Sequence, residues 1–173
     1  MRKIEHFEAH LDDYGIVTAY ISKEFYQGKS DAFYLRDAHG KLSKCAIFSF
    51  ELSSQDYSKY TLGVADDLVI GDPYELLEEH GRAVVLQYSL ITKSARFDEE
   101  FYYEGKDLGC HPSEEKTDFA IWAPTAHRVV LELFRETGAE VYEAKRHEKG
   151  VFKTSFVGNG HGLSYAYHIY VNG

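Results

Sequence analysis

Several kinds of residue and segment are scarce in this chain of 173 residues. No apolar run approaches the roughly 20 residues of a membrane-spanning helix, and the first residues become charged before a signal peptide forms. Basic residues number 19 against 28 acidic ones, which gives a formal net charge of −9. Nucleic-acid binding depends on a basic face, so this balance argues against it. We therefore expect no membrane segment and no nucleic-acid partner.

Cysteine is also rare in the chain. Its two cysteines, Cys45 and Cys110, lie far apart in the sequence. Because no secretion signal is recognised, we expect two reduced, buried thiols rather than a disulfide. For the same reason the expected compartment is the cytoplasm.

The remaining composition is that of a folded, strand-rich protein. Hydrophobic residues make up 44% of the chain and charged residues 27%, as in globular domains. Fourteen tyrosines and eleven phenylalanines, against a single methionine, favour strands. The length allows one or two small domains and excludes a complete eightfold βα barrel, which needs about 250 residues.

Alternation of apolar and polar residues with a period of two is the clearest pattern, and it predicts strands. The runs follow one another at short intervals, with Gly, Asn, Asp or Ser between many of them, as in antiparallel sandwiches. The predicted fold is therefore all-β, with two small antiparallel β-sandwich modules. The alternating runs lie at 16–21, 46–52, 60–64, 84–90, 119–123, 129–133, 152–156 and 165–171.

Two segments interrupt the series of strands. Residues 72–81 begin with Asp72, Pro73 and Glu75 in the order of a capping box and end at Gly81, which predicts a short helical connector. Residues 93–117 are polar, lack sustained alternation and carry Gly and Pro near their end, which predicts a boundary. The predicted domains are residues 1–94 and 95–173.

A search for catalytic or metal-binding residues finds no strong candidate. His6 and His10 are four positions apart, but Glu8 between them does not give the HExxH order, and we expect a surface or fraying terminus. The Gly158–Gly162 segment matches no phosphate-binding loop and predicts a hairpin connection. Adjacent carboxylates on a strand point to opposite faces, so no pair is expected to act as acid and base. Those neighbours are Asp12/Asp13, Asp66/Asp67, Glu78/Glu79, Asp98/Glu99/Glu100 and Glu114/Glu115. We assign no catalytic residue, no metal site and no cofactor.

The aromatic residues leave one candidate for ligand binding. Trp122 is the single tryptophan, and its place in the alternation puts it on the face opposite to Phe119 and Ile121. An exposed aromatic ring offers a flat apolar surface to the C–H face of a pyranose ring, whereas most strand aromatics pack in a core or against a neighbour. Structural packing is the expected role of Trp122, and direct contact with a glycan is the alternative.

The second half of the chain resembles the family 48 carbohydrate-binding module. The segment Phe119-Ala-Ile-Trp-Ala-Pro-Thr-Ala126, followed by Val129-Val-Leu-Glu-Leu133, is similar to the module's F-x-(I/V/L)-W-A-P-x-A-x-x-V-x-L opening. Leu108-Gly109, Gly150-Val-Phe152 and the G-x-x-Y-x-Y strand at Gly162–Tyr167 follow the module's order. This resemblance implies that the second module is an immunoglobulin-like sandwich.

The upstream half is similar to the N-terminal region of bacterial type I pullulanases. The resemblance rests on Val69–Leu76, Leu86–Ser89 and the F-D-E-x-F-x-Y-x-G-x-x-L-G pattern that begins at Phe97. It implies a cytoplasmic-type enzyme that hydrolyses α-1,6 linkages in pullulan and branched α-glucans with two carboxylates. The family's YNWGYDP signature is absent from this sequence. The chain is therefore expected to be the non-catalytic N-terminal portion, inactive by itself, that supports the barrel and binds α-glucan weakly or not at all.

Alternatives to this interpretation stay open at the level of sequence. The chain ends on Asn172-Gly173, a hairpin signal with no returning strand, which favours a piece of a longer protein over a fortuitous tail. A free-standing α-glucan-binding or regulatory module is the alternative, and a small unrelated β-enzyme is a third class. If the catalytic barrel is missing, an uncovered apolar surface is expected to cause self-association.

Overall fold

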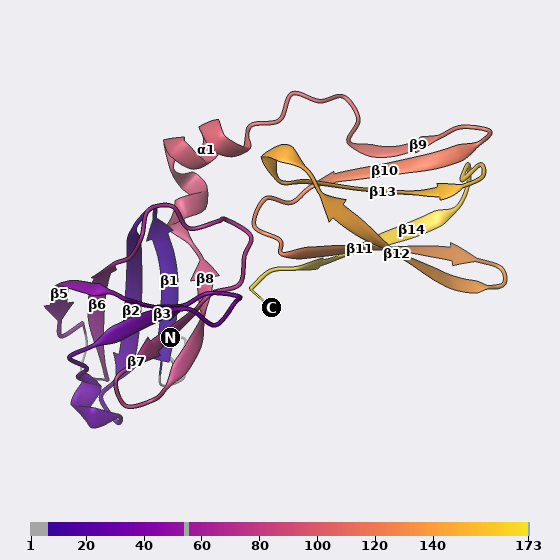
Figure 1. Cartoon of the computed structure of the whole chain (residues 1–173). Coiled ribbons are helices and arrows are strands. Elements are labelled where there is room, and N and C mark those ends of the chain that lie inside the picture. Colours follow the sequence, from indigo (N-terminus) through magenta and orange to yellow (C-terminus); the bar gives the residue numbers. More distant parts are fainter. Residues whose placement is uncertain (1–6, 54–55, 173) are drawn as a thin grey trace. The chain divides into compact units, whose positions relative to one another are not determined.

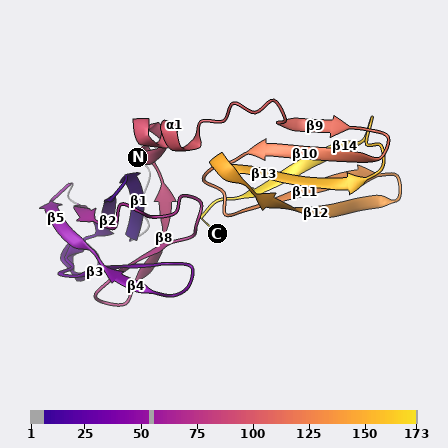
Figure 2. The ribbon, with the colours of Figure 1, turned by 45° about the horizontal axis from the view of Figure 1, so that its top comes forward.

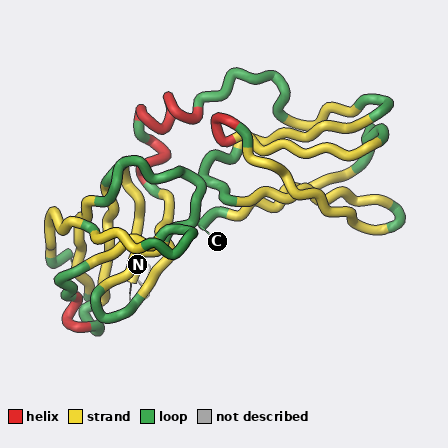
Figure 3. The backbone as a smooth tube through the Cα atoms, viewed as in Figure 1, coloured by secondary structure: helices red, strands yellow, loops and turns green. Residues whose placement is uncertain are grey.

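A computed structural model describes residues 7–53 and 56–172. Strands dominate these residues, and the helical segments among them are short (Figures 1 and 3). The chain divides into two compact units, one up to Asp98 together with Asn172 and the other covering Glu99–Val171. The predicted all-β class with two sandwich-like modules is confirmed. None of the helices in the described part of the chain has the length and apolar character of a membrane span.

The first unit is built on an eight-stranded sheet in the order β4-β3-β7-β8-β1-β2-β6-β5. Its neighbouring strands are antiparallel, apart from the parallel pair β1 and β8. The strands are β1 (Phe7–Asp13), β2 (Ile16–Ser22), β3 (Phe33–Arg36), β4 (Leu42–Lys44), β5 (Ala46–Glu51), β6 (Tyr57–Gly63), β7 (Glu75–Glu78) and β8 (Ala83–Tyr88).

Both ends of this strand order are carried by one stretch of chain. A single residue, Cys45, separates β4 from β5, and its N–H donates to the carbonyl of Phe33 at 2.9 Å. The sheet therefore curls back on itself, so that apolar side chains from distant strands fill one interior. Phe33, Leu62 and Leu76 have no exposed surface there. Figure 2 shows β3 and β4 beside each other within this curl.

Strand β1 corrects the expectation of a fraying terminus for the described residues of that segment. It lies inside the sheet between β8 and β2, and its Ala9 and Leu11 are 0% and 1% exposed. The alternation of Phe7, Ala9 and Leu11 with polar residues carries the strand signal, although Ala at its centre weakens it. His10 lies on β1 beside Glu8, whereas His6 lies outside the described residues.

Strand β7 corrects the predicted helical connector at residues 72–81. Glu75–Glu78 pairs with both β3 and β8, and Leu76 is fully buried between them. The capping pattern is a local signal, and pairing with two strands outweighs it because the strand buries Leu76 and satisfies both backbone edges. Gly81 does adopt a left-handed conformation, at φ +90°, but it turns β7 into β8.

The second unit has a six-stranded arrangement in the order β14-β11-β12-β13-β10-β9. Strand β12 pairs along its length with β11 and, at its end, with β13, so it passes from one layer to the other. Figure 2 shows β9, β10 and β13 side by side. Leu131, Leu133, Phe119 and Phe156 form one part of the core between the layers. The strands are β9 (Gly109–Pro112), β10 (Lys116–Trp122), β11 (Arg128–Arg135), β12 (Gly138–Arg146), β13 (Val151–Val157) and β14 (Ser164–Tyr170).

The Gly158–Gly162 segment is not the hairpin turn that we predicted. It connects β13, which pairs with β10, to β14, which pairs with β11, so it crosses between layers. The buried hydroxyl of Thr117 holds this crossing: it donates to the carbonyl of Gly158 at 2.9 Å and accepts the N–H of Gly160 at 2.7 Å.

The predicted boundary segment contains short regular elements. Helix α1 (Ala95–Phe101) follows the 3-10 turn η2 (Leu90–Lys93), and Phe97 and Phe101 are 4% and 6% exposed. These two rings are packed, whereas Tyr102 is exposed. Two further 3-10 turns are η1 (Tyr26–Gly28) and η3 (Glu148–Gly150).

Candidate functional site

Trp122, the one candidate residue from the sequence, lies at the end of β10 with 44% of its surface exposed. Its indole Nε1–H donates to the carbonyl oxygen of Phe101 at 2.9 Å. That bond ties the end of α1 to the sheet, and Lys149 adds a second tie through a 3.3 Å bond from its Nζ to the carbonyl of Glu99 in the same helix. The N–H of Trp122 is thus engaged in packing, while part of its ring stays open to solvent. Neither of its two predicted roles is decided by these contacts.

The carboxylate of Asp107, in the segment that follows α1, is held between two hydrogen-bond donors. Lys153 Nζ lies 2.6 Å from Asp107 Oδ2, and the hydroxyl of Tyr103 donates to Asp107 Oδ1. The hydrogen bond from Lys153, followed by that from Tyr103, lowers the pKa of Asp107 to about 2. The same contacts raise the pKa of Lys153 and of the Tyr103 phenol. Asp107 is therefore ionised at neutral pH, and the three groups form a fixed polar cluster.

A cavity of about 230 Å³ adjoins this cluster, and it makes this part of the second unit the candidate site. Val151, which lines the cavity, is the register partner of Trp122 across β10 and β13, although Trp122 is not itself a lining residue. Aromatic surface beside ammonium, imidazole and carboxylate groups is suited to a polyhydroxylated ligand, since such groups hydrogen bond to hydroxyls. The cavity is lined by Tyr103, His147, Glu148, Val151 and Lys153.

The residues of this polar cluster, unlike Trp122, were not found by sequence reasoning. Asp107 and Lys153 are 46 positions apart and come from a connecting segment and a strand. No local motif joins them, and only the crossing of residues 101–107 over β10 and β13 brings them together. The aromatic residues at 97–103 lie near Asp107 in the sequence, but they carry no pattern that points to Lys153.

The comparisons with known proteins find a different family in each half of the chain. The pullulanase N1-terminal domain family matches residues 7–93, and carbohydrate-binding module 48, the isoamylase N-terminal domain, matches residues 107–173. The chain belongs to the pullulanase N1-terminal domain family. The resemblance to pullulanases and to the family 48 module is therefore confirmed.

Individual relatives of this family are pullulanases of greater length. A pullulanase of Bacillus subtilis (strain 168) is 29% identical over 170 residues, which are 94% of this chain and 22% of that protein. The crystal structure of a pullulanase from Anoxybacillus sp. LM18-11 complexed with maltotriose has 31% identity and a TM-score of 0.89, covering 96% of this chain and 24% of that one. The type I pullulanase of Bacillus subtilis str. 168 complexed with maltose gives 28% identity and a TM-score of 0.88, over 99% of this chain and 24% of the other. The chain thus spans less than a quarter of the length of these relatives.

The module 48 signature has a structural explanation in this chain. Gly150 adopts φ +70°, and a Cβ on it would lie 2.4 Å from the Cα of Pro124, so the W-A-P turn occupies the space that a side chain would need. The Ala123 N–H donates to the Gly150 carbonyl at 3.0 Å. Arg146 donates to the carbonyls of Pro124 and Ala126 at 2.8 and 2.7 Å. These signature residues fix a turn of the sandwich.

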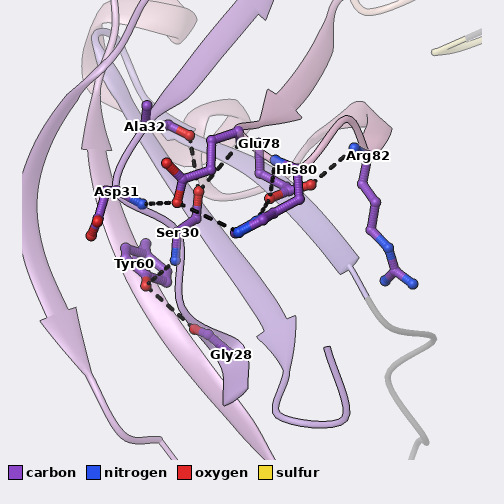
Figure 4. A network of polar contacts seen from close by, with 9 residues as sticks. Gly28, Ser30, Asp31, Ala32, Tyr60, Glu78, His80 and Arg82 are labelled. Atoms are coloured by element: carbon purple, nitrogen blue, oxygen red, sulfur yellow. Dashed lines mark hydrogen bonds and ion pairs between the residues drawn. The ribbon is translucent and has the colours of Figure 1, made fainter. Parts of the chain in front are cut away.

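The remaining sequence candidates do not assemble into a reactive centre among the described residues. His10 lies 3.5 Å from Glu8, and within residues 7–53 and 56–172 no group of three or more His, Cys, Asp or Glu is placed to hold a metal ion. Glu78 is buried and lies 2.6 Å from His80 Nδ1 (Figure 4), while Glu79 lies 3.9 Å from His80 Nε2 and accepts the Asp31 N–H at 2.6 Å, so both carboxylates are engaged by neighbouring groups. The predicted absence of metal, cofactor and catalytic residues stays a prediction.

Both cysteines are free thiols, as expected. Cys45 is buried at 5% exposure, whereas Cys110 is partly exposed. Burial raises the pKa of the Cys45 thiol to about 11 and also raises the pKa of Cys110. The thiolate is the reactive form of cysteine, and a nucleophilic cysteine has a lowered pKa. The pKa is raised in both Cys45 and Cys110, so neither has this property.

Proposed function

We propose that this chain is the glucan-handling part of a debranching enzyme, namely a type I pullulanase that hydrolyses α-1,6-glucosidic linkages in pullulan and branched α-glucans. The observation that carries the proposal is the match of the two halves of the chain, in order, to the pullulanase N1-terminal domain and to carbohydrate-binding module 48, together with a pullulanase that aligns over 170 residues of the chain. Similarity over 96% of the chain to a pullulanase complexed with maltotriose supports α-glucan as the ligand. The chemistry itself belongs to a longer protein, and this chain is proposed to support that catalytic part.

The cavity beside Trp122 is the proposed place of glucan contact in the second unit. The exposed part of the indole offers an apolar face, and Lys153, His147 and Glu148 offer groups that donate to or accept from sugar hydroxyls. Because the site is shallow and the indole N–H is already bonded to Phe101, affinity for a short oligosaccharide is expected to be weak.

The experiment that tests this function has two parts. Calorimetric titration with maltotetraose, with cellotetraose as the β-linked control, measures glucan binding, and Lys153→Met and Trp122→Phe test the site. A reducing-sugar assay with pullulan compares the 173-residue chain with the longest product of its reading frame. Selective binding of the α-glucan, no hydrolysis by the chain and hydrolysis by the longer product are expected. Hydrolysis by the purified chain, or a reading frame that encodes no hydrolase, would overturn the proposal.

Apolar surface on the first unit bears on the predicted self-association. Ile47, Phe48 and Phe50 of β5, and Leu52 just after it, are 40–66% exposed, although the alternation at 46–52 suggested a buried face. Uncovered apolar patches favour association. Sedimentation velocity over a concentration series tests this prediction, with Phe48→Ser expected to reduce any oligomer.

The cytoplasmic location likewise stays a prediction, which cell fractionation tests.

A further inference from the structure

The loop between β13 and β14 (Figure 1) carries an inference that does not depend on the proposed function. The chain contains two asparagines, Asn159 and Asn172, and a glycine follows each of them. In an Asn-Gly pair the glycine nitrogen can attack the carbon of the side-chain amide, because glycine has no side chain to hinder the approach. Gly173 lies outside the described residues, whereas the loop places Asn159 at the surface and buries Gly160.

The side-chain amide of Asn159 is held in a form that favours attack on its carbon. The backbone N–H of His161 donates to Asn159 Oδ1 at 2.9 Å. This oxygen takes on negative charge when a nucleophile adds to Cγ, so a hydrogen-bond donor on it stabilises the addition. Because the side chain is exposed, water can reach it and ammonia can leave. The electrophilic half of the reaction is therefore in place in the folded chain.

The attacking nitrogen, that of Gly160, is not free in the folded chain. Its N–H donates at 2.7 Å to the hydroxyl of Thr117, a residue with 0% exposed surface. The Thr117 hydroxyl in turn donates to the Gly158 carbonyl at 2.9 Å, so this neutral group is no base for the Gly160 proton. Attack on Asn159 requires the nitrogen to lose its proton and to turn toward Cγ, and either change breaks a buried hydrogen bond.

Packing around Gly160 also keeps its peptide group from rotating. A Cβ on Gly160 would lie 2.8 Å from Phe156 Cζ and 2.8 Å from Thr117 Oγ1, so the backbone itself fills this space. The Gly160 carbonyl accepts the Leu163 N–H at 3.1 Å. The backbone after Asn159 is thus fixed while the side chain of Asn159 is exposed.

We propose that Asn159 is a deamidation site that is protected by the fold of the second unit, because Thr117 withholds the attacking nitrogen. When this unit unfolds, the Gly160 nitrogen gives its proton to hydroxide and bonds to Cγ of Asn159. The bond from Cγ to Nδ2 then breaks, and Nδ2 leaves as ammonia with a proton from water. A second water opens the cyclic imide. Cleavage between Cγ and the nitrogen gives aspartate, and cleavage between the main-chain carbonyl carbon and the nitrogen gives isoaspartate.

The isoaspartate product has a consequence for refolding. Its main chain runs through Cβ and Cγ and is longer by one carbon, which displaces Gly160 from the Thr117 hydroxyl. A buried hydroxyl without its donor and a displaced crossing between the two layers both destabilise the second unit. Each period in the unfolded state therefore converts part of the chain into a less stable form.

Peptide mass mapping of the 173-residue chain, incubated either in native buffer or in urea at the same alkaline pH, tests the proposal. Asn159 is expected to be modified at least about tenfold faster in urea. In native buffer, Thr117→Val removes the acceptor and is expected to accelerate the modification about tenfold. Thr117→Ser keeps the hydroxyl, and Thr154→Val makes the same change at a less buried threonine, so both are expected to stay within about twofold of the unaltered chain.

Each part of the proposal has a result that would overturn it. Equal rates in native buffer and in urea would refute protection by the fold, and an unmodified Asn159 in urea would refute the site. Both results come from the unaltered chain, so they hold even where Thr117→Val impairs folding. A Thr117→Val chain that is folded by its Trp122 fluorescence, and is modified no faster than the unaltered chain, would refute the role of Thr117.

The effect on refolding is tested with Asn159→Ser. Serine offers an oxygen to the His161 N–H but has no amide to lose. After the same time in urea, Asn159→Ser is expected to regain its original urea midpoint on refolding, whereas the unaltered chain is expected to regain a lower one. Equal recovery of the two chains, at a time when isoaspartate is present at position 159 of the unaltered one, would refute the destabilising effect.

Discussion

Gly150→Ala is expected to destabilise the second unit strongly, because the added methyl group has no room. Its Cβ would lie 2.4 Å from the Cα and 2.6 Å from the Cβ of Pro124, distances at which something must move. The Pro124 turn resists movement, since Arg146 donates to its carbonyl and the neighbouring Ala123 N–H is bonded to Gly150 itself. Overpacking of this kind costs about 1–3 kcal/mol. The left-handed φ of +70° adds about 1–2 kcal/mol for a residue with a side chain.

A second glycine separates these two contributions. Gly162 has a similar φ of +80°, but no heavy atom of the described residues lies within 4 Å of the Cβ that alanine would add. Gly162→Ala is therefore expected to show the conformational cost of about 1–2 kcal/mol alone. The difference between the two variants measures the steric clash, and we expect it to be about 1–3 kcal/mol.

Urea unfolding followed by tryptophan fluorescence is the appropriate assay. Trp122 is the only tryptophan and lies in the second unit, so its emission reports that unit even where the two units unfold separately. The free energies of unfolding of the two variants are compared only where their m-values are equal, because a changed m-value indicates a changed denatured state or the loss of two-state unfolding. If Gly150→Ala is no less stable than Gly162→Ala, the close approach of Gly150 to Pro124 is not a constraint on the fold, and our explanation of the signature fails.

Three further predictions concern single side chains. Thr117→Val removes a buried hydroxyl that bridges two backbone groups of the loop after β13. In the same urea assay it is expected to lower the free energy of unfolding by about 1–3 kcal/mol. Thr154→Val, at a less buried threonine, is the control. The carboxyl carbon of Asp107, followed as pH is lowered, is expected to report a pKa of about 2, and in Lys153→Met this pKa is expected to rise toward 3.8. The Asp107–Lys153 pair therefore stabilises the fold fully above pH 3.8 and loses this contribution as pH falls through about 2. An unchanged pKa in the variant would contradict this explanation. Cys45 is expected to react with a thiol reagent at pH 8 only after unfolding, because it is buried and its pKa is raised to about 11, so rapid labelling of the native chain at this residue would be the contrary result.

The strands that the sequence revealed are those whose alternation uses large apolar residues. In β11 and β13 the inward positions are Val, Leu and Phe, so the period of two is visible without knowledge of the partners. In β1 the inward positions include Ala9, and in β7 a capping pattern overlies the buried positions Leu76 and Glu78. Pairing with distant strands decides the conformation of these two segments, and that information is not local.

The candidate site differs from the strands in how little of it is visible in sequence. Trp122 stands out because it is the only residue of its type, but Asp107 and Lys153 carry no pattern that joins them. The site arises where a connecting segment meets a strand that is distant in sequence.

Most residues by which the module is recognised serve the fold, and Trp122 is the one among them that is also proposed to contact sugar. Ala123, Pro124 and Gly150 form a turn held by Arg146, and the indole N–H of Trp122 is bonded to a backbone carbonyl. The turn stabilises the sandwich whichever polar side chains line the cavity, because its bonds run between Arg146 and backbone groups. Substitutions in the turn should consequently lower stability, and substitutions at Lys153 should lower glucan affinity with the fold intact. A variant set in which both properties always fall together would show instead that binding depends on the turn itself.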